Sequence, residues 1–244
     1  MKERPIILNA EMVHAVLASR KTQMRRIMKV QPSEHFNPMN MALETDYTAR
    51  WYTPGVVDKH GYLQPAKKQV FGVAGEDEGY ICPFGALGDR LWVREAWMPD
   101  APRDGTWADV EFYGCKGSPL SMIPKRFRKP EHCIHRASWN GSEMVGWTPS
   151  IHMPRWASRI TLEITGVRVE RLQDISQEDA HSEGLELTGW RPTYNDPDSG
   201  GEVMTPYDNF AELWESIYGE ESWQANPWVW VIDFKRLDNA DKAG

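Results

Sequence analysis

The sequence lacks any long hydrophobic run and has few cysteines. No stretch of the 244 residues approaches the roughly 18 uninterrupted apolar residues that a membrane span needs. The apolar run at residues 6–8 is too short for the core of a signal peptide. The three cysteines, Cys82, Cys115 and Cys133, favour free thiols in a reducing compartment over a disulfide framework. We therefore expect a cytoplasmic protein with no membrane partner.

Several common catalytic motifs are also missing. The sequence has no glycine-rich phosphate loop, no Ser-His-Asp spacing and no helical His-Glu-x-x-His motif, which excludes P-loop nucleotide hydrolysis and the common protease classes. His132, Cys133 and His135, with Cys82 or Cys115, match no established zinc spacing. We therefore predict neither a metal site nor a cofactor.

Positive charge is in deficit overall but is unevenly distributed. The formal net charge is −7, which argues against a protein that coats nucleic acid through charge alone. Residues 1–40 nevertheless carry seven basic and three acidic side chains, whereas residues 174–221 carry thirteen acidic side chains and one basic. This division predicts a basic patch near one functional site and an acidic, solvated flank, although solubility alone also explains such runs.

The hydrophobic pattern predicts short strands separated by a few helices. Helices are expected after Asn9, after Ser176 and from Thr205 to Gly219, each with a capping residue and a helical apolar spacing or a glycine stop. Strands are expected at residues 5–8, 20–29, 69–73, 79–82, 90–97, 110–113, 133–137, 158–172 and 228–234. Residues 158–172 fit either one long strand bent at Gly166 or two strands. The order of elements predicts an α+β fold, an open or closed mixed β-barrel with a few short helices, over one domain of residues 1–244. Residues 98–147 are expected to form an insertion lobe.

Four motifs spread over nearly the whole chain lie at residues 19–26 (SRKTQMRR), 88–93 (GDRLWV), 175–184 and 228–234. They resemble those of the ASCH (activating signal cointegrator homology) domain family. The chain is most similar to a longer form common in bacteriophages and prophages, which shares residues 82–85 (CPFG), 149–159 (PSIHMPRWASR) and 222–230. This resemblance implies a PUA-like barrel and a protein that acts on RNA or nucleosides in the cytoplasm of a bacterial host cell.

The resemblance also implies site residues. Small bacterial members hydrolyse the amide of N4-acetylcytidine with a Lys, a Thr and a Glu, and these positions fall on Lys21, Met24 and Glu183 of this chain. Met24 departs from the family, because a thioether has no proton to lose and forms no acyl ester. Thr22 lies on the same face of an extended strand as Met24 but roughly 6 to 7 Å away, so it does not replace the missing nucleophile. Positive neighbours disfavour the protonated form of Lys21 and would suit it to act as a base or as a donor to a developing oxyanion, while Glu183 would orient or deprotonate a water.

The remaining candidate residues are basic or aromatic. Arg20, Thr22, Arg25 and Arg26 are expected to face a ligand beside Lys21, although without the resemblance the run fits a charged strand edge. The run Lys125, Arg126, Phe127, Arg128 and Lys129 places one aromatic ring among four cations, which suits base stacking with phosphate neutralisation. His152 suits a contact to a base edge or a buried hydrogen bond. Arg155 and Arg159 suit a phosphate or a carboxylate of the protein itself.

Three functions remain open at this point. The first is recognition of a nucleobase, free or within RNA or single-stranded DNA, in a basic pocket walled by Lys21, Met24, Arg26 and Glu183. The second is N4-acylcytidine amidohydrolysis by Lys21 and Glu183 with water. The third is a protein-binding accessory or anti-defence factor in which residues 174–221 mimic nucleic acid charge.

Overall fold

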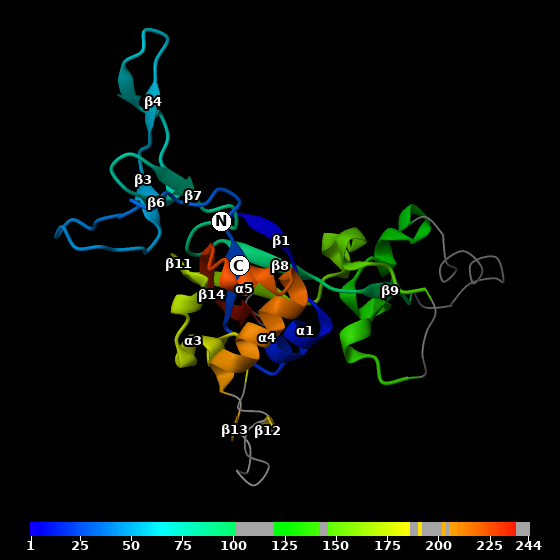
Figure 1. Ribbon diagram of the computed structural model, residues 1–244. Helices are drawn as coiled ribbons and strands as arrows, with labels where there is room; N and C mark the ends of the chain where they lie inside the picture. The colour runs from blue at the N-terminus through cyan, green and yellow to red at the C-terminus, as the bar shows by residue number, and fades with distance from the viewer. Residues whose placement is uncertain (101–119, 142–145, 186–189, 192–201, 204, 238–244) are drawn as a thin grey trace. The chain divides into compact units, whose positions relative to one another are not determined.

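The computed structural model describes residues 1–100, 120–141, 146–185, 190–191, 202–203 and 205–237 (Figure 1). The chain divides into two compact units, and each is described by itself. The first comprises Met1–Ser19, Arg90–Leu162 and Arg236–Gly244, and the second comprises Arg20–Asp89 and Glu163–Lys235. Within the part of the chain that the structure describes, no helix is long and apolar enough to cross a membrane.

The first unit is built on a parallel strand pair. Its strands and α-helix are β1 (Glu3–Ile7), α1 (Ala10–Leu17), β8 (Arg90–Arg94), β9 (Trp97–Pro99) and β10 (Cys133–His135). Its 3-10 helices are η1 (Leu120–Met122), η2 (Lys125–Phe127), η3 (Pro130–His132), η4 (Arg136–Ser138), η5 (Ser150–His152) and η6 (Arg155–Ala157). Strand β1 pairs with β8 in parallel, and β10 pairs with β9 antiparallel. The Asn9 side chain accepts a hydrogen bond from the Met12 amide at 2.8 Å, which satisfies one of the free amides that begin α1.

Aromatic and aliphatic side chains form the core of this first unit. Leu91 and Val93 are buried on one face of β8, as their alternation with polar residues predicts. Trp97 is fully buried and packs with Met153 and Ala157. The residues at 149–159 therefore serve packing as well as any contact with a ligand.

The second unit contains four sets of paired strands and most of the α-helical residues. Its strands are β2 (Gln23–Ile27), β3 (Arg50–Tyr52), β4 (Gly55–Val57), β5 (Leu63–Pro65), β6 (Val70–Ala74), β7 (Gly79–Ile81), β11 (Thr161–Arg171), β12 (Trp190–Arg191), β13 (Glu202–Val203) and β14 (Trp228–Leu237). Its helices are η7 (Leu172–Asp174), α3 (Gln177–Ser182), α4 (Pro206–Tyr218) and α5 (Glu221–Gln224). Strands pair in the orders β11-β14-β2, β3-β6-β7 and β4-β5, and the short strands β12 and β13 also pair. The first two residues of β11 and the last two residues of β14 belong to the first unit.

Helices α3 and α4 pack on the sheet strand β14 through one apolar cluster. The cluster contains Phe210 and Trp214, one turn apart on α4, together with Val229 and Val231 of β14. Thr205 and Asp208 form a reciprocal capping box at the start of α4, and Gly219 ends the helix at a φ of 94°. The predicted apolar stripe of α4 is shorter than expected, because Ile217 is exposed.

The α+β class is confirmed. The paired strands of the described residues form open sheets and no closed barrel, so the closed form of the expected barrel is not seen in this part of the chain. Residues 161–171 form one continuous strand, which selects the single-strand alternative. The sequence pattern missed the strands between residues 50 and 65, and the strand expected at residues 110–113 lies outside the described residues.

Candidate functional site

Lys21 and Glu183 meet in the second unit although 162 residues separate them. Lys21 lies just before β2 and Glu183 is the C-cap residue of α3, and the two form an isolated antiparallel bridge. The Thr22 amide donates to the Ser182 carbonyl at 2.8 Å, which fixes this approach. The Lys21 Nζ donates to the Glu183 carbonyl oxygen at 2.9 Å and forms an ion pair with its carboxylate. The side chains are 2% and 5% exposed, so water has almost no access to the pair.

Arg25 extends the pair into a larger buried network. Its Nη1 lies 3.1 Å from Glu183 Oε1, its Nε donates to Glu170 Oε1 at 2.9 Å, and its Nη2 lies 3.3 Å from Asp179 Oδ2. It also donates to the Gln23 side-chain oxygen. The guanidinium side chain is fully buried. Three carboxylates therefore compensate a charge that would otherwise be costly to bury.

Arg168 joins the same network at its solvent-facing end. Its guanidinium contacts Glu170 at 3.1 Å, Asp179 at 3.0 Å and Asp233 at 3.5 Å. The Arg168 and Asp233 side chains are 30% and 37% exposed. Gln23 Nε2 donates to Asp179 Oδ1 at 3.0 Å and to Asp233 Oδ1 at 2.7 Å, and so links the buried end to the exposed end.

We refer to these residues together as the ionic cluster: Lys21, Gln23, Arg25, Arg168, Glu170, Asp179, Glu183 and Asp233. It contains three cations and four carboxylates, so it is not a basic wall. The expectation that residues 20–29 display their charges is wrong at Lys21 and Arg25, which are 3% and 1% exposed. Both side chains can be buried because carboxylates from β11 and from the end of α3 neutralise their charge. The local sequence of residues 20–29 does not reveal these partners, because they are far away along the chain.

Strand and helix periodicity bring the cluster together. Gln23 and Arg25 share one face of β2, and Met24 lies on the other face and is fully buried. Arg168 and Glu170 likewise share a face of β11, whereas Val169 between them is buried. Asp179 and Glu183 are four residues apart at α3 and so lie on one side of it. Met24, where the resemblance predicted the nucleophile position, therefore faces away from this side of β2.

Burial and charge act in opposite directions on the titratable groups. Burial lowers the pKa of Lys21, and Arg26 and Arg25 lower it further, whereas the Glu183 carboxylate opposes this shift. Burial favours a higher pKa for Asp179, but the hydrogen bond from Gln23 and the charges of Arg168 and Arg25 together hold that pKa below its ordinary value. The pKa of Lys21 is thus lowered, as its basic neighbours predicted, but burial is the main cause.

The other residues predicted beside Lys21 are not part of the ionic cluster. Arg20 is exposed and its Nη1 donates to the Gly184 carbonyl at 3.1 Å. Thr22 is also exposed. Arg26 is half-buried and donates to the Arg25 carbonyl at 3.0 Å.

The basic run at residues 125–129 belongs to the first unit and differs from its prediction. Phe127 is 9% exposed and packs against Ile123, and the Arg126 guanidinium lies over its ring at 4.6 Å from the centroid. The ring is therefore not available to stack on a base, because η2 turns it into the local core. Arg128 is half-buried and donates to the Ile123 carbonyl at 3.0 Å, whereas Lys125, Arg126 and Lys129 remain exposed.

The candidates at residues 149–159 also lie in the first unit. His152 is exposed, so it is not a buried hydrogen-bonding histidine. Arg155 pairs with Glu3 at 2.8 Å, and Arg159 binds both carboxylate oxygens of Glu95 at 2.9 Å. Of the two roles considered for these arginines, the structure gives each a carboxylate of the protein itself.

Sequence reasoning missed three carboxylates, a glutamine and an arginine that complete the ionic cluster. These residues are Glu170, Asp179, Asp233, Gln23 and Arg168. The alternation of residues 167–171 places Arg168 and Glu170 on one face of a strand, which was the available sign of this site. Polar residues on one face of a strand usually face solvent, so the pattern did not indicate a buried cluster. No group of three or more His, Cys, Asp or Glu among the described residues lies close enough to hold a metal ion.

No protein-family model, no curated protein and no solved structure matches this chain.

Proposed function

We propose that this chain is an ASCH-domain protein of the long bacteriophage or prophage type, with a PUA-like fold, that recognises a nucleobase, free or within RNA or single-stranded DNA. The observation that carries the proposal is the direct pairing of Lys21 with Glu183. The family resemblance assigns these two residues to one site, and their separation of 162 residues makes a chance meeting a poor explanation.

The solvent-facing end of the ionic cluster suits a base edge. Asp179 and Asp233 offer carboxylate oxygens, which accept hydrogen bonds from an exocyclic amino group such as that of cytosine. Arg168 offers N–H donors for a ring nitrogen or carbonyl. With four carboxylates against three cations, recognition here would depend on hydrogen bonds to the base rather than on an excess of positive charge.

A second candidate is amidohydrolysis of an N4-acylated cytidine. In its favour, burial lowers the pKa of Lys21, so its neutral amine is more accessible as a base beside Glu183. Water would attack the amide carbonyl carbon while the neutral Lys21 amine takes one proton of that water. The C–N bond would then break, the Lys21 ammonium would return this proton to the departing cytidine amine, and the acyl group would leave as the carboxylic acid. Against it, Met24 is fully buried and offers no nucleophile, and Lys21 and Glu183 are engaged with each other. Base recognition is therefore the better supported function.

Calorimetric titration with cytidine, N4-acetylcytidine and a cytidine-containing single strand tests the proposal. We expect Arg168→Gln to weaken nucleobase binding about tenfold or more, because it removes a charge-assisted donor. Lys235→Gln is the matched control, because Lys235 pairs with Glu163 at 3.0 Å and lies outside the ionic cluster. Absence of binding to all three ligands at low salt would rule out recognition of a nucleobase and favour the protein-binding alternative.

The enzyme candidate has its own test in the release of cytidine from N4-acetylcytidine, followed by chromatography. Turnover by the unmodified chain that Lys21→Ala abolishes would establish an enzyme. Met24→Thr is expected to restore no activity, because its hydroxyl would lie in the core on the opposite face of β2 from Gln23 and Arg25. We expect this change to destabilise the fold by roughly 2 kcal/mol or more, because it removes buried apolar volume and buries a hydroxyl. Activity gained by Met24→Thr would contradict the first expectation, and an unchanged midpoint of urea unfolding would contradict the second.

A further inference from the structure

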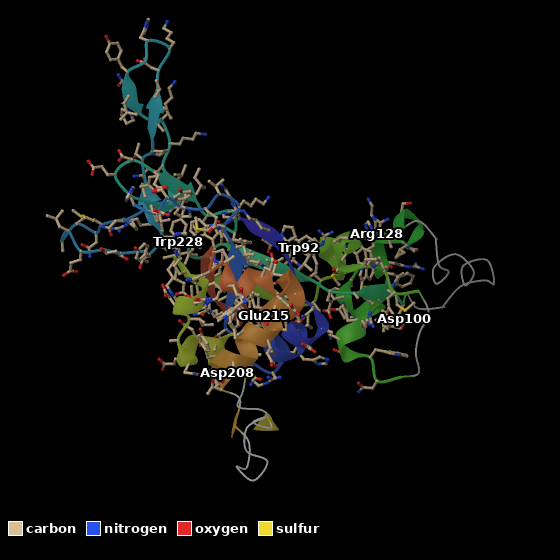
Figure 2. All side chains as sticks on the ribbon, viewed as in Figure 1. Trp92, Asp100, Arg128, Asp208, Glu215 and Trp228 are labelled. Carbon is tan, nitrogen blue, oxygen red and sulfur yellow. The ribbon has the colours of Figure 1, made fainter. Side chains whose placement is uncertain are left out.

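The hairpin of β4 and β5 has no core of its own. Figure 1 shows these strands as a hairpin that continues from β3 and β6, and side chains stand out from it on both sides in Figure 2. All six residues of β4 and β5 are exposed, including Val57 at 69% and Leu63 at 73%. An isolated two-stranded hairpin is only marginally stable in water, so a function has to explain why the chain keeps one.

The tip of the hairpin is nevertheless well ordered by hydrogen bonds. The Asp58 amide donates to the Tyr62 carbonyl at 2.9 Å, and the Gly61 amide donates to the Asp58 carbonyl at 3.0 Å. Asp58 Oδ1 accepts hydrogen bonds from the His60 amide at 2.8 Å and from the Tyr62 amide at 3.0 Å. Gly61 adopts a φ of +87°, which favours glycine. The only carboxylate of the hairpin is therefore occupied in holding the loop.

The hairpin together with its flanking residues, residues 50–68, is basic and aromatic on a chain that is acidic overall. Residues 50–68 contain four Lys and Arg side chains and one acidic side chain, within a chain of net charge −7. Lys59, Lys67 and Lys68 are all exposed. Tyr62 is 68% exposed and Trp51, at the base, is 57% exposed and packs against Phe71 at 5.6 Å between ring centroids.

We propose that the β4–β5 hairpin binds single-stranded nucleic acid, with Tyr62 stacking on a base and Lys59, Lys67 and Lys68 contacting phosphates. Exposed rings among cations are the arrangement that binds single strands without dependence on sequence, because every base offers a flat face. The charge of the hairpin is complementary to the phosphate backbone. This inference rests on the proposed function and adds a contact surface outside the ionic cluster.

The order of the tip adds to this proposal. A loop that is already held in one conformation loses little entropy on binding, so its contacts contribute more fully to affinity. An acidic protein segment would also be attracted to the three lysines, but it would not require a flat aromatic ring at position 62. The ring therefore distinguishes the two partners.

Fluorescence anisotropy with a labelled single strand of roughly 20 nucleotides, as RNA and as DNA, tests the proposal over a range of salt concentrations. The triple variant Lys59→Ala, Lys67→Ala, Lys68→Ala should reduce the slope of log affinity against log salt by about 2, at about 0.7 for each phosphate contact to a single strand. The matched control replaces three exposed lysines elsewhere, Lys2, Lys29 and Lys235, by Ala and should change the slope by less than half as much.

Substitutions at Tyr62 test stacking. Tyr62→Leu keeps an apolar side chain and should weaken binding about tenfold, whereas Tyr62→Phe keeps the ring and the affinity. Melting temperatures should not change, because the side chain is 68% exposed.

Three results would overturn the proposal. Binding by the unmodified chain that the hairpin variants leave intact would overturn it while leaving the proposed function in place. No binding of either strand at low salt would overturn it as well, and the nucleoside titration then decides the proposed function separately. Loss of affinity in the triple variant but not in Tyr62→Leu would indicate a general polyanion surface and would overturn the stacking contact.

Discussion

Replacing Glu183 by Gln is the most informative perturbation of the ionic cluster. Lys21 has no other carboxylate partner in the cluster, whereas Arg25 keeps Glu170 and Asp179. With its charge uncompensated and its side chain 2% exposed, Lys21 would give up its proton in the folded state. The amide of Gln keeps the shape of the side chain, so the change acts mainly on charge.

The cost of this proton loss can be bounded. Each pH unit by which the solution lies below the ordinary lysine pKa of 10.5 adds about 1.36 kcal/mol to the free energy of deprotonating the amine. Deprotonation of Lys21 therefore costs at most about 5 kcal/mol at pH 7 and about 2 kcal/mol at pH 9. Breaking a buried pair by removing one partner typically costs about 3 to 5 kcal/mol, which agrees with this bound. The folded state binds fewer protons than the unfolded state in this window, so the stability of Glu183→Gln should rise with pH.

Urea unfolding followed by circular dichroism at pH 7 and pH 9 measures this difference. Glu163→Gln is the control, because its pair with Lys235 is half-exposed and should contribute about 1 kcal/mol or less. Adding Lys21→Met to Glu183→Gln should recover about 2 kcal/mol at pH 7, because no buried amine then remains. A cost below about 1 kcal/mol at pH 7, or a cost that is equal at the two pH values, would refute the reasoning.

Two further predictions concern other buried positions. Burial lowers the pKa of His135 below the ordinary histidine value of 6.5. Below about pH 6.5 the unfolded chain therefore binds a proton at His135 more readily than the folded chain does, so acid should lower the free energy of unfolding. We expect His135→Gln, which keeps a donor for the Ala157 carbonyl, to reduce the fall in melting temperature between pH 7 and pH 5, and an unchanged fall would contradict this. Gly72→Ala should destabilise the fold by about 3 kcal/mol in urea unfolding, because a Cβ there would lie 1.9 Å from the Tyr80 carbonyl oxygen. Gly75→Ala should leave the free energy of unfolding nearly unchanged, because a Cβ there would have its nearest neighbour atom at 3.5 Å. Equal losses of stability at the two glycines would show that the close contact at Gly72 does not cause the destabilisation.

Local pattern was sufficient for many of the elements. Helix α4 followed from Pro206 after a capping threonine and from Gly219 at its end, and both signals act within a few residues. Strand β8 followed from its alternation. The β4–β5 hairpin was missed because its side chains are exposed on both faces, so they show no alternation between apolar and polar residues.

The candidate site shows where sequence reasoning stops. The resemblance alone linked Lys21 to Glu183, and no local pattern predicted that Arg25, Glu170 and Asp179 would join them. The pattern of residues 125–129 predicted that Phe127 is available for stacking, but its ring is buried in the folded chain.

The sequence by itself determined where helices begin and end, which strand faces are apolar, and that charge is divided along the chain. Only the tertiary structure decided which charges neutralise one another and which remain in water. The physical reason is that hydrogen-bond caps and side-chain periodicity act between neighbours in sequence, whereas the burial of Lys21 depends on a carboxylate 162 residues away. A charged side chain can be buried only where such a partner is brought to it, and that is a property of the folded chain.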